Sequence, residues 1–278
     1  MLAGFAMVVL AAASWGTWSL FLRPADMPVA VSTAVIFAVM AIAAIPLALR
    51  EPRGRWDRTT WLLIAANAAA DGINCATFFG AIARTTVAIA VLTHYVTPVL
   101  VALLAPRIDR VASPGAKPAA LVALAGLVIV LEPWRAAADG ALVGAALGLT
   151  SACCYAANVF LVRRLAVRIG GARALALHAA MVAVVALPLA GPHLSELTTS
   201  ALSYLVAGGI VVGTLAGVLF ARGLVRIGSA RAAVLTFAEP IVAVTVGALV
   251  WDERLRPLAA VGGALILGAG IHVAQKAR

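Results

Sequence analysis

Three polar side chains and one aromatic ring share one face of a strongly apolar segment. Asn67, Asp71 and Asn74 are spaced at i, i+4 and i+7, and Phe78 follows one turn later. Helical spacing of this kind predicts a single polar stripe. At the middle of a membrane span a carboxylate such as Asp71 costs on the order of 2.5 to 3.5 kcal/mol. The stripe therefore indicates either a site for a solute or a proton, or a cluster of hydrogen bonds between helices.

A second carboxylate, Glu239, directly precedes Pro240 in another apolar segment. Proline removes one helical hydrogen bond and frees a carbonyl one turn back, so we predict a bend at this point. A bend beside an acid at membrane depth suits contact with an ion or a solute. The other interpretation is a neutral structural acid beside a proline that only shapes packing. Pro98 predicts an equivalent bend, with His94 and Tyr95 just before it.

Two further apolar segments carry aromatic and polar residues that could line a binding site. These are Trp15 and Trp18 in the first segment, and Tyr155 and Asn158 in the other. Aromatic walls with a few polar groups suit organic solutes that have an apolar portion. Tryptophan also anchors helices at the membrane surface, which is the alternative for Trp18 and the role expected of Trp251 at the end of a segment.

No other constellation predicts chemistry. His178 and His272 stand alone in apolar runs, and we expect them to be structural. No set of His, Asp or Glu has metal-ligand spacing, no serine lies in a nucleophile elbow, and no Walker A sequence is present. We therefore expect no metal, no cofactor and no catalytic activity. We expect the three cysteines to act as small buried hydrophobic residues: Cys75, Cys153 and Cys154.

The amino-acid composition indicates whether the surface of this chain faces water or lipid. Its residues are 64% hydrophobic and 12% charged, with a mean hydropathy of +1.06. Soluble domains are about half apolar and about a quarter charged, so most of this surface must face a lipid bilayer. The net charge of +10 comes from arginines scattered between apolar runs rather than from a clustered basic face. That pattern is typical of topology signals, and it argues against a nucleic-acid partner.

Long apolar runs predict an all-α membrane protein with ten transmembrane helices. Their approximate bounds are Leu2–Leu22, Pro28–Leu49, Trp61–Ala83, Val87–Ala105, Pro118–Leu131, Ala141–Val162, Ala174–Leu189, Ser200–Ala221, Ala232–Val250 and Leu258–Val273.

The distribution of positive charge predicts the orientation. If the N-terminus is cytoplasmic, the inner loops and the tail hold sixteen of the 21 Lys and Arg residues, and the outer loops hold five. Short loops rich in Lys and Arg stay in the cytoplasm. We therefore expect a multi-pass protein of a bacterial-type inner membrane, with both termini cytoplasmic.

The chain also repeats itself. Residues 84–101 align without gaps with residues 226–243, and this register pairs the two prolines described above. Residues 12–23 align with residues 152–163 at nearly the same offset. Chance similarity between Ala- and Val-rich helices is the alternative, but matched aromatic, proline and arginine positions favour a true repeat.

This repeat divides the chain into residues 1–135 and 136–278, each with five predicted spans. Because five is odd, the two halves must enter the membrane in opposite directions. Inverted repeats of this kind are common in secondary transporters, whose substrate site lies near the midplane where the halves meet.

The motifs at the two ends of this plan carry a family resemblance. The first half opens with AAASWGTWSLFLR, and the second ends with TFAEPIVAVTVGALVWDERLRPLAAVGGALILGAGI, which includes an acidic turn at Asp252 and Glu253. Ten spans with these motifs resemble the drug/metabolite transporter superfamily, and within it the EamA-type transporters. The first half departs from the family pattern, since APRIDRVASPGAK is longer than its counterpart and lacks the glutamate.

The resemblance implies a secondary transporter that exports small organic metabolites, amino acids or related compounds, by alternating access around a central cavity. The tripeptide AEP at residues 238–240 resembles the corresponding helix of threonine and homoserine exporters. A multidrug or organic-cation efflux transporter is the alternative, because acids in an aromatic cavity suit cations. A membrane enzyme would need a catalytic cluster at one membrane face, and none is found. Asp71, His94 and Glu239 are the residues that could carry coupling protons.

Overall fold

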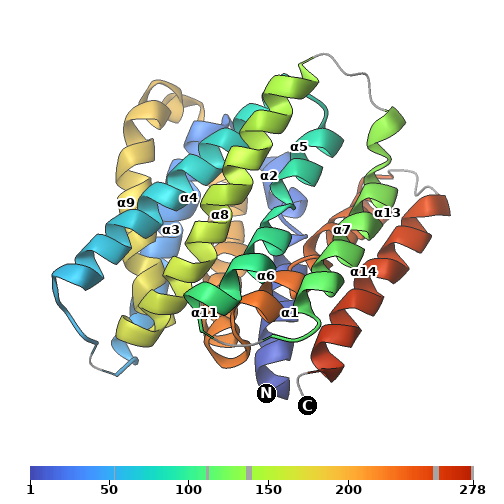
Figure 1. The fold of residues 1–278 in the computed structure, drawn as a ribbon. Helices are drawn as coiled ribbons and strands as arrows, with labels where there is room; N and C mark the ends of the chain where they lie inside the picture. The colour runs from blue at the N-terminus through green and yellow to red at the C-terminus, as the bar shows by residue number, and fades with distance from the viewer. Residues whose placement is uncertain (53, 111–112, 136–139, 253–256, 277–278) are drawn as a thin grey trace.

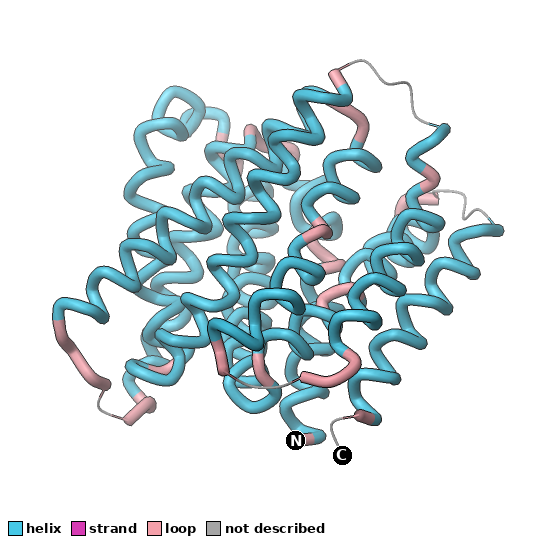
Figure 2. Tube along the Cα trace, viewed as in Figure 1, coloured by secondary structure: helices cyan, strands magenta, loops and turns pink. Residues whose placement is uncertain are grey.

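The computed structural model describes residues 1–52, 54–110, 113–135, 140–252 and 257–276, and all regular secondary structure in these residues is helical (Figures 1 and 2). Among them, nine helical segments are long and apolar enough to cross a membrane, and Ala116–Leu131 is a shorter apolar helix. The predicted all-α class with ten spans is therefore confirmed. The first helix begins and the last helix ends at the same end of the molecule, which we call the terminus end (Figure 1).

The ten spans are built from fourteen α-helices and one π-helical segment. In the first half they are α1 (Leu2–Trp15), α2 (Ser19–Ala25), α3 (Val29–Leu49), α4 (Arg58–Arg84), α5 (Val87–His94), α6 (Thr97–Ile108) and α7 (Ala116–Leu131). In the second half they are α8 (Ala141–Ile169), α9 (Gly171–Ala190), α10 (Thr199–Gly208), η3 (Gly209–Leu215, the π-helical segment), α11 (Ala216–Ile227), α12 (Ser229–Leu235), α13 (Ala238–Val250) and α14 (Pro257–Gln275). Short 3₁₀ turns lie at Pro133–Arg135 and Gly191–Glu196.

Two helices continue well past the predicted ends of their spans. The sixth span was predicted to end at Val162 and the eighth at Ala221, but α8 reaches Ile169 and α11 reaches Ile227. Hydropathy falls where arginines begin, whereas arginine is a good helix former and lets the helix run on into water. Arg168 in this extension is also held by a carboxylate of the first half. Of the predicted acidic turn, Glu253 lies outside the described residues, and Asp252 has a positive φ of 53°.

Both proline-containing spans are interrupted at the matched positions. The fourth span breaks between α5 and α6, and the ninth between α12 and α13. Pro98 cannot bond the carbonyl of His94, and the Thr97 hydroxyl donates to that oxygen instead, at 2.7 Å. In the ninth span, Pro240 cannot donate to the carbonyl oxygen of Thr236 one turn earlier. That oxygen accepts a hydrogen bond from the Glu239 N–H instead, at 3.0 Å. Local donors thus satisfy the backbone at both breaks.

A third interruption, between α1 and α2, was not predicted. It lies at residues 16–18, where no proline signals it. Gly16 packs against the backbone of α13, and a Cβ there would lie 2.7 Å from the Cβ of Val242. Only glycine permits this approach of α1 to α13. The corresponding span of the second half, α8, is continuous, so the two halves differ here.

The most extensive helix contacts all join one half to the other. The second span packs on the seventh (α3 on α9), the fourth on the ninth (α6 on α12) and the fifth on the tenth (α7 on α14). The third span packs on the sixth (α4 on α8). In the same way, the eighth span packs on the first (α11 on α1). Equivalent spans of the two sets of five thus make equivalent contacts.

Candidate solute-binding cavity

A cavity of about 670 Å³ lies between the two halves. Its volume falls within the range of about 300 to 1,000 Å³ that is typical of small-molecule sites. Ten of the eleven side chains that the sequence predicts at a solute site line it: Trp15, Trp18, Asn67, Asp71, Asn74, Phe78, His94, Tyr155, Asn158 and Glu239. The structure thus brings these residues together around one space, and their contact with a solute stays a prediction.

Tyr95, the eleventh residue, does not line the cavity. It follows directly on His94 at the end of α5, and consecutive residues of a helix point about 100° apart. His94 therefore faces the cavity, while the Tyr95 ring is buried against Phe237, with ring centroids 5.6 Å apart. Its hydroxyl lies close to the Glu239 carboxylate. Tyr95 can thus position Glu239 from behind the cavity wall.

A chain of hydrogen bonds orients His94. The Ser151 hydroxyl donates to Asn74 Oδ1 at 2.6 Å, and His94 Nδ1 lies 2.7 Å from the same hydroxyl oxygen. Because a hydroxyl has one proton, His94 Nδ1 must be the donor to Ser151. The imidazole also stacks on Tyr155, with an interplanar angle of 14°, and lies beside Phe78. Helices α4, α5 and α8 together fix this side chain.

The second polar centre joins α4 to α9. His178 Nε2 lies 3.1 Å from Asp71 Oδ2, and His178 Nδ1 lies 3.4 Å from the carbonyl oxygen of Ala174. The interpretation of His178 as an isolated histidine was therefore wrong. Its partner is 107 residues away in the chain, and only the packing of α4 on α9 brings them together. The one available signal was a polar residue within an apolar span.

The contact between His178 Nε2 and Asp71 Oδ2 joins two ionisable side chains from different helices inside the membrane-spanning region. Which ring nitrogen of His178 carries the hydrogen depends on the tautomer of the imidazole. With the hydrogen on Nε2, a neutral His178 donates directly to the Asp71 carboxylate.

Asn67 is the most unusual residue of the cavity wall. Its side chain is fully buried, and neither Oδ1 nor Nδ2 has a hydrogen-bond partner among the described residues. More than nine-tenths of buried polar groups in proteins are satisfied, so an unpartnered amide needs an explanation. Asn67 borders the cavity one turn from Asp71, and both of its amide atoms are enclosed by protein in this conformation.

Aromatic residues border the cavity at the end opposite the termini. The Arg23 guanidinium lies 5.1 Å from the centre of the Trp251 ring, and the Trp251 indole donates to the Ser19 hydroxyl at 3.1 Å. Both Arg23 and Trp251 line the cavity. Trp251 therefore contacts the cavity as well as ending α13, since the interruption after α1 brings α2 against the end of α13, and its role as an interfacial anchor stays a prediction.

Carboxylates of the first half hold the second half at the terminus end. Glu51 accepts hydrogen bonds from the backbone N–H groups of Ala172 and Arg173, each at 3.0 Å, at the start of α9. This geometry caps the helix and complements its dipole. The Arg173 guanidinium in turn donates to carbonyl oxygens at the end of α3, among them that of Ala48 at 2.9 Å.

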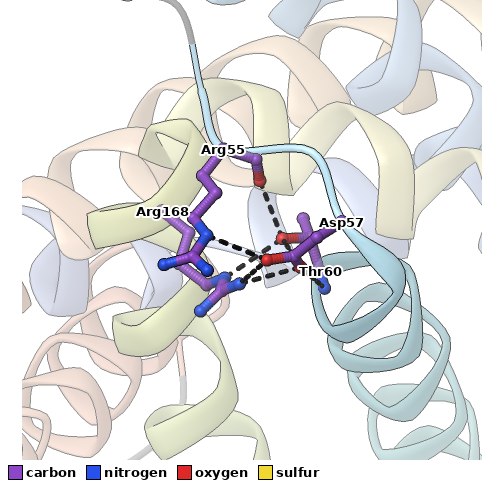
Figure 3. Close-up of polar contacts among 4 residues, drawn as sticks. All are labelled: Arg55, Asp57, Thr60 and Arg168. Atoms are coloured by element: carbon purple, nitrogen blue, oxygen red, sulfur yellow. Dashed lines mark hydrogen bonds and ion pairs between the residues drawn. The ribbon is translucent and has the colours of Figure 1, made fainter.

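A second contact at the same end is shown in Figure 3. Asp57 caps α4 through the Thr60 N–H at 2.8 Å, and it accepts from Arg168 Nη2 at 2.6 and 2.8 Å. Arg55 Nε lies 2.9 Å from the same carboxylate. The hydrogen bond from the Thr60 backbone, followed by those from the Thr60 and Arg168 side chains, lowers the pKa of Asp57 to about 2.

A third carboxylate, Asp109 at the end of α6, completes this set. It lies 3.2 Å from Arg163 of α8 and accepts from the Ser229 N–H, at the start of α12, at 3.2 Å. We call these three contacts, made by Glu51, Asp57 and Asp109, the terminus-end bridges. Each of them joins the first half to the second.

Comparison with known proteins identifies this architecture. The sequence profile of the EamA-like transporter family matches residues 2–131 and again residues 142–273. The chain belongs to the EamA-like transporter family. Membership of the drug/metabolite transporter superfamily follows, and the resemblance noted in the sequence is confirmed.

Two further similarities cover almost the whole of this EamA-family chain. An uncharacterized transporter of Archaeoglobus fulgidus is 28% identical over 273 residues, which are 98% of this chain and 96% of that protein. A solved structure, described only as the crystal structure of a protein, superposes with a TM-score of 0.82 at 22% identity, covering 98% of this chain and 97% of the other. At that identity the solved structure supports the fold alone.

Proposed function

We propose that this EamA-family chain is a secondary transporter that exports small organic metabolites, amino acids or related compounds, by alternating access. The observation that carries the proposal is the cavity of about 670 Å³ between the two halves, with aromatic and polar walls. A rocking motion of one half against the other would expose such a cavity to each side of the membrane in turn. The breaks at Pro98 and Pro240 are the hinges we propose for this motion.

The same proposal includes an orientation. We place both termini in the cytoplasm of a bacterial-type inner membrane, with residues 1–135 and 136–278 inserted in opposite directions. The terminus-end bridges then lie on the cytoplasmic side. They would hold that side closed in the present conformation and would have to open for a cytoplasmic solute to enter.

Protons are the coupling ion that we propose. Asp71 and His178 contact each other, line the cavity and join the two halves, so a change in the packing of α4 on α9 would alter the surroundings of both ionisable groups. Glu239 and His94 are the other titratable residues of the wall that we include. Transport would then respond to a pH gradient across the membrane.

Reconstitution in liposomes tests the function and the coupling separately. Counterflow of a radiolabelled neutral amino acid should exceed that of empty liposomes, and no counterflow with any amino acid would overturn the proposed substrate class. An imposed pH gradient should then accelerate transport by the wild type but not by an Asp71→Asn, Glu239→Gln double variant. An unchanged response in that variant would refute coupling through these acids while leaving the transport function intact.

The second candidate is a multidrug or organic-cation efflux transporter. It is favoured by two cavity carboxylates, Asp71 and Glu239, among aromatic walls that suit delocalised cations. Growth of an overexpressing host distinguishes the two candidates. Resistance to toxic amino-acid analogues supports metabolite export, whereas resistance confined to lipophilic cations supports the alternative.

A further inference from the structure

Ser151 of α8 connects two polar side chains of the cavity wall without lining the cavity itself. Its side chain is fully buried. The Ser151 hydroxyl donates to Asn74 Oδ1 of α4 at 2.6 Å, and His94 Nδ1 of α5 lies 2.7 Å from the same oxygen. Ser151 belongs to the second half and both of its partners belong to the first, so this contact also joins the halves.

We propose that Ser151 is a positioning residue for proton coupling: with Asn74 it holds the hydrogen of neutral His94 on Nδ1 and leaves Nε2 to take the coupling proton from the cavity. On proton uptake, the lone pair of Nε2 forms an N–H bond and the imidazole becomes an imidazolium. The inference rests on the proposed function, in which His94 is a titratable residue of the wall. It adds a residue behind that wall and assigns the atom of His94 that binds the proton.

The directions of the hydrogen bonds support this assignment. The Ser151 hydroxyl has a single hydrogen, which is directed at Asn74 Oδ1, so its oxygen can only accept from His94 Nδ1. In an imidazole, the hydrogen bond made by one nitrogen sets the tautomer and therefore the state of the other nitrogen. Nε2 of a neutral His94 is then an acceptor, and no described residue donates to it.

The same arrangement lets His94 gain and lose a proton without any change in its neighbours. An imidazolium donates from both nitrogens. The bonds from His94 to Ser151 and from Ser151 to Asn74 therefore persist when Nε2 is protonated. In the reverse arrangement Asn74 would donate to Ser151, and Ser151 to His94 Nδ1. The hydrogen of neutral His94 would then lie on Nε2, and proton uptake at Nδ1 would require both hydrogen bonds to reverse.

Aromatic rings and a backbone contact hold the imidazole in place for this role. The Tyr155 ring stacks on it with centroids 5.3 Å apart, and the Phe78 ring lies 4.6 Å away. Aromatic faces within about 6 Å attract a cation, so these rings suit the protonated imidazole as well as the neutral one. The Thr97 hydroxyl, which bonds the His94 carbonyl oxygen, also lies 3.1 Å from the Ala152 carbonyl oxygen and so fastens the end of α5 to α8.

The charges around His94 are compatible with a proton on Nε2. The titratable side chains that surround it come from its own helix, from α8 and from the cavity wall: Tyr95, Tyr155, Asp71, Cys75 and Glu239. The positive groups of the described wall lie elsewhere, Arg23 against Trp251 and His178 against Asp71. Proton uptake at Nε2 therefore puts no two cations of the described wall in contact.

The tautomer of His94 can be measured directly in the purified full-length protein. Nitrogen-15 NMR with labelled histidine, at mildly alkaline pH, distinguishes a ring nitrogen that carries a hydrogen from one that does not. The signals that are absent from His94→Gln identify this residue among the histidines. We expect the hydrogen of His94 on Nδ1. A hydrogen on Nε2 in the wild type would overturn the proposal.

Variants of the two partners sharpen this measurement. Asn74→Leu leaves the Ser151 hydroxyl without its acceptor, so the hydroxyl should turn toward Nδ1 and the hydrogen of His94 should move to Nε2. Ser151→Ala should give a mixture of both tautomers, whereas Ser151→Thr retains the hydroxyl and should keep the hydrogen on Nδ1. Thr150→Val is the matched control, since the adjacent Thr150 hydroxyl is exposed and bonds the Ala146 carbonyl of its own helix. The same tautomer in all four variants would overturn the role of Ser151.

Transport in liposomes tests whether this position matters for coupling. Ser151→Ala should reduce the acceleration by an imposed pH gradient severalfold more than it reduces counterflow, which needs no gradient. Ser151→Thr should restore the response to the gradient. Equal losses in the two assays would assign Ser151 a structural role and refute the proposal.

The outcomes also separate this inference from the proposed function. Wild-type protein that performs counterflow but carries the hydrogen on His94 Nε2 would refute the positioning role of Ser151 and leave the transporter. Protein that carries the hydrogen on Nδ1 but performs no counterflow of any organic solute would refute the transporter and leave the assigned tautomer.

Discussion

Arg168 Nη2 lies 2.6 Å from Asp57 Oδ2, and this contact joins the end of α8 to the start of α4 (Figure 3). The two residues are 111 positions apart in the chain and belong to different halves. The Arg55 N–H also donates to the Arg168 carbonyl at 2.9 Å, so side chain and backbone both fasten the α3–α4 loop to α8. If the halves move, this contact must break.

The first prediction concerns that movement. Asp57→Asn removes the negative charge opposite Arg168 and should favour conformations in which the terminus end is open. A cysteine at Val162, which lines the cavity on α8, should then react with a maleimide severalfold faster, in a background with the native cysteines replaced by alanine. Mass spectrometry of the labelled protein measures the rate.

Arg55→Gln is the matched control for this experiment. The Arg55 side chain is 77% exposed, and exposed ion pairs contribute little. The rate of maleimide labelling at position 162 in the Arg55→Gln variant should therefore equal the rate in the protein that retains both Asp57 and Arg55. If Asp57→Asn also leaves the rate unchanged, the contact with Arg168 does not restrain the closed conformation.

The pKa of Asp57 predicts how this contact depends on pH. Its value is lowered from 3.8 to about 2, so the folded state favours the carboxylate. The resulting stabilisation is fully present above about pH 4 and is lost as the pH falls through 2. The difference in unfolding temperature between wild type and Asp57→Asn, followed by tryptophan fluorescence, should be constant from pH 8 to pH 4 and narrow below it. A difference that already narrows between pH 7 and pH 5 would show that another group controls the contact.

The residues of the cavity wall could be predicted because polar groups are rare in these spans. A carboxylate or amide within an apolar helix is costly unless it faces protein or water, so Asp71, Asn74 and Glu239 were identifiable from position alone. The pairing of Asp71 with His178 was not, because a histidine carries no mark of the helix against which it packs. The proline breaks were also predictable, since proline removes a definite hydrogen bond.

The interruption at Gly16 and the terminus-end bridges needed the structure. Gly16 matters because α13 passes close to it, which is a property of packing and not of the local sequence. Glu51 and Asp57 lie in a loop that the charge pattern marked only as cytoplasmic. Their partners at the ends of α8 and α9 are more than 100 residues away in the chain.

Glu51 should contribute measurably to stability. Its two carboxylate oxygens satisfy the first N–H groups of α9, and substitution of a helix cap typically costs about 1 kcal/mol. We expect Glu51→Gln to lower the free energy of unfolding in detergent by about that amount. Glu196→Gln is the control, because among the described residues Glu196 pairs with the exposed His193, and its loss should have little effect. Equal stability of the two variants would argue against a capping role for Glu51.

The contact of α1 with α13 gives the last prediction. A Cβ at Gly16 would lie 2.7 Å from the Cβ of Val242 and close to the Glu239 carbonyl oxygen, so Gly16→Ala must push the two helices apart. Overpacking of this kind costs about 1–3 kcal/mol. Gly72→Ala is the matched control, since no atom of a neighbouring described residue lies within 4 Å of a Cβ there and alanine is the better helix former. Chemical denaturation should show Gly16→Ala destabilised and Gly72→Ala equal to wild type or more stable.

Because Gly16 borders the cavity beside Glu239, Gly16→Ala should also slow counterflow in liposomes. Undiminished stability and counterflow in Gly16→Ala would mean that α1 and α13 can separate at this point without consequence.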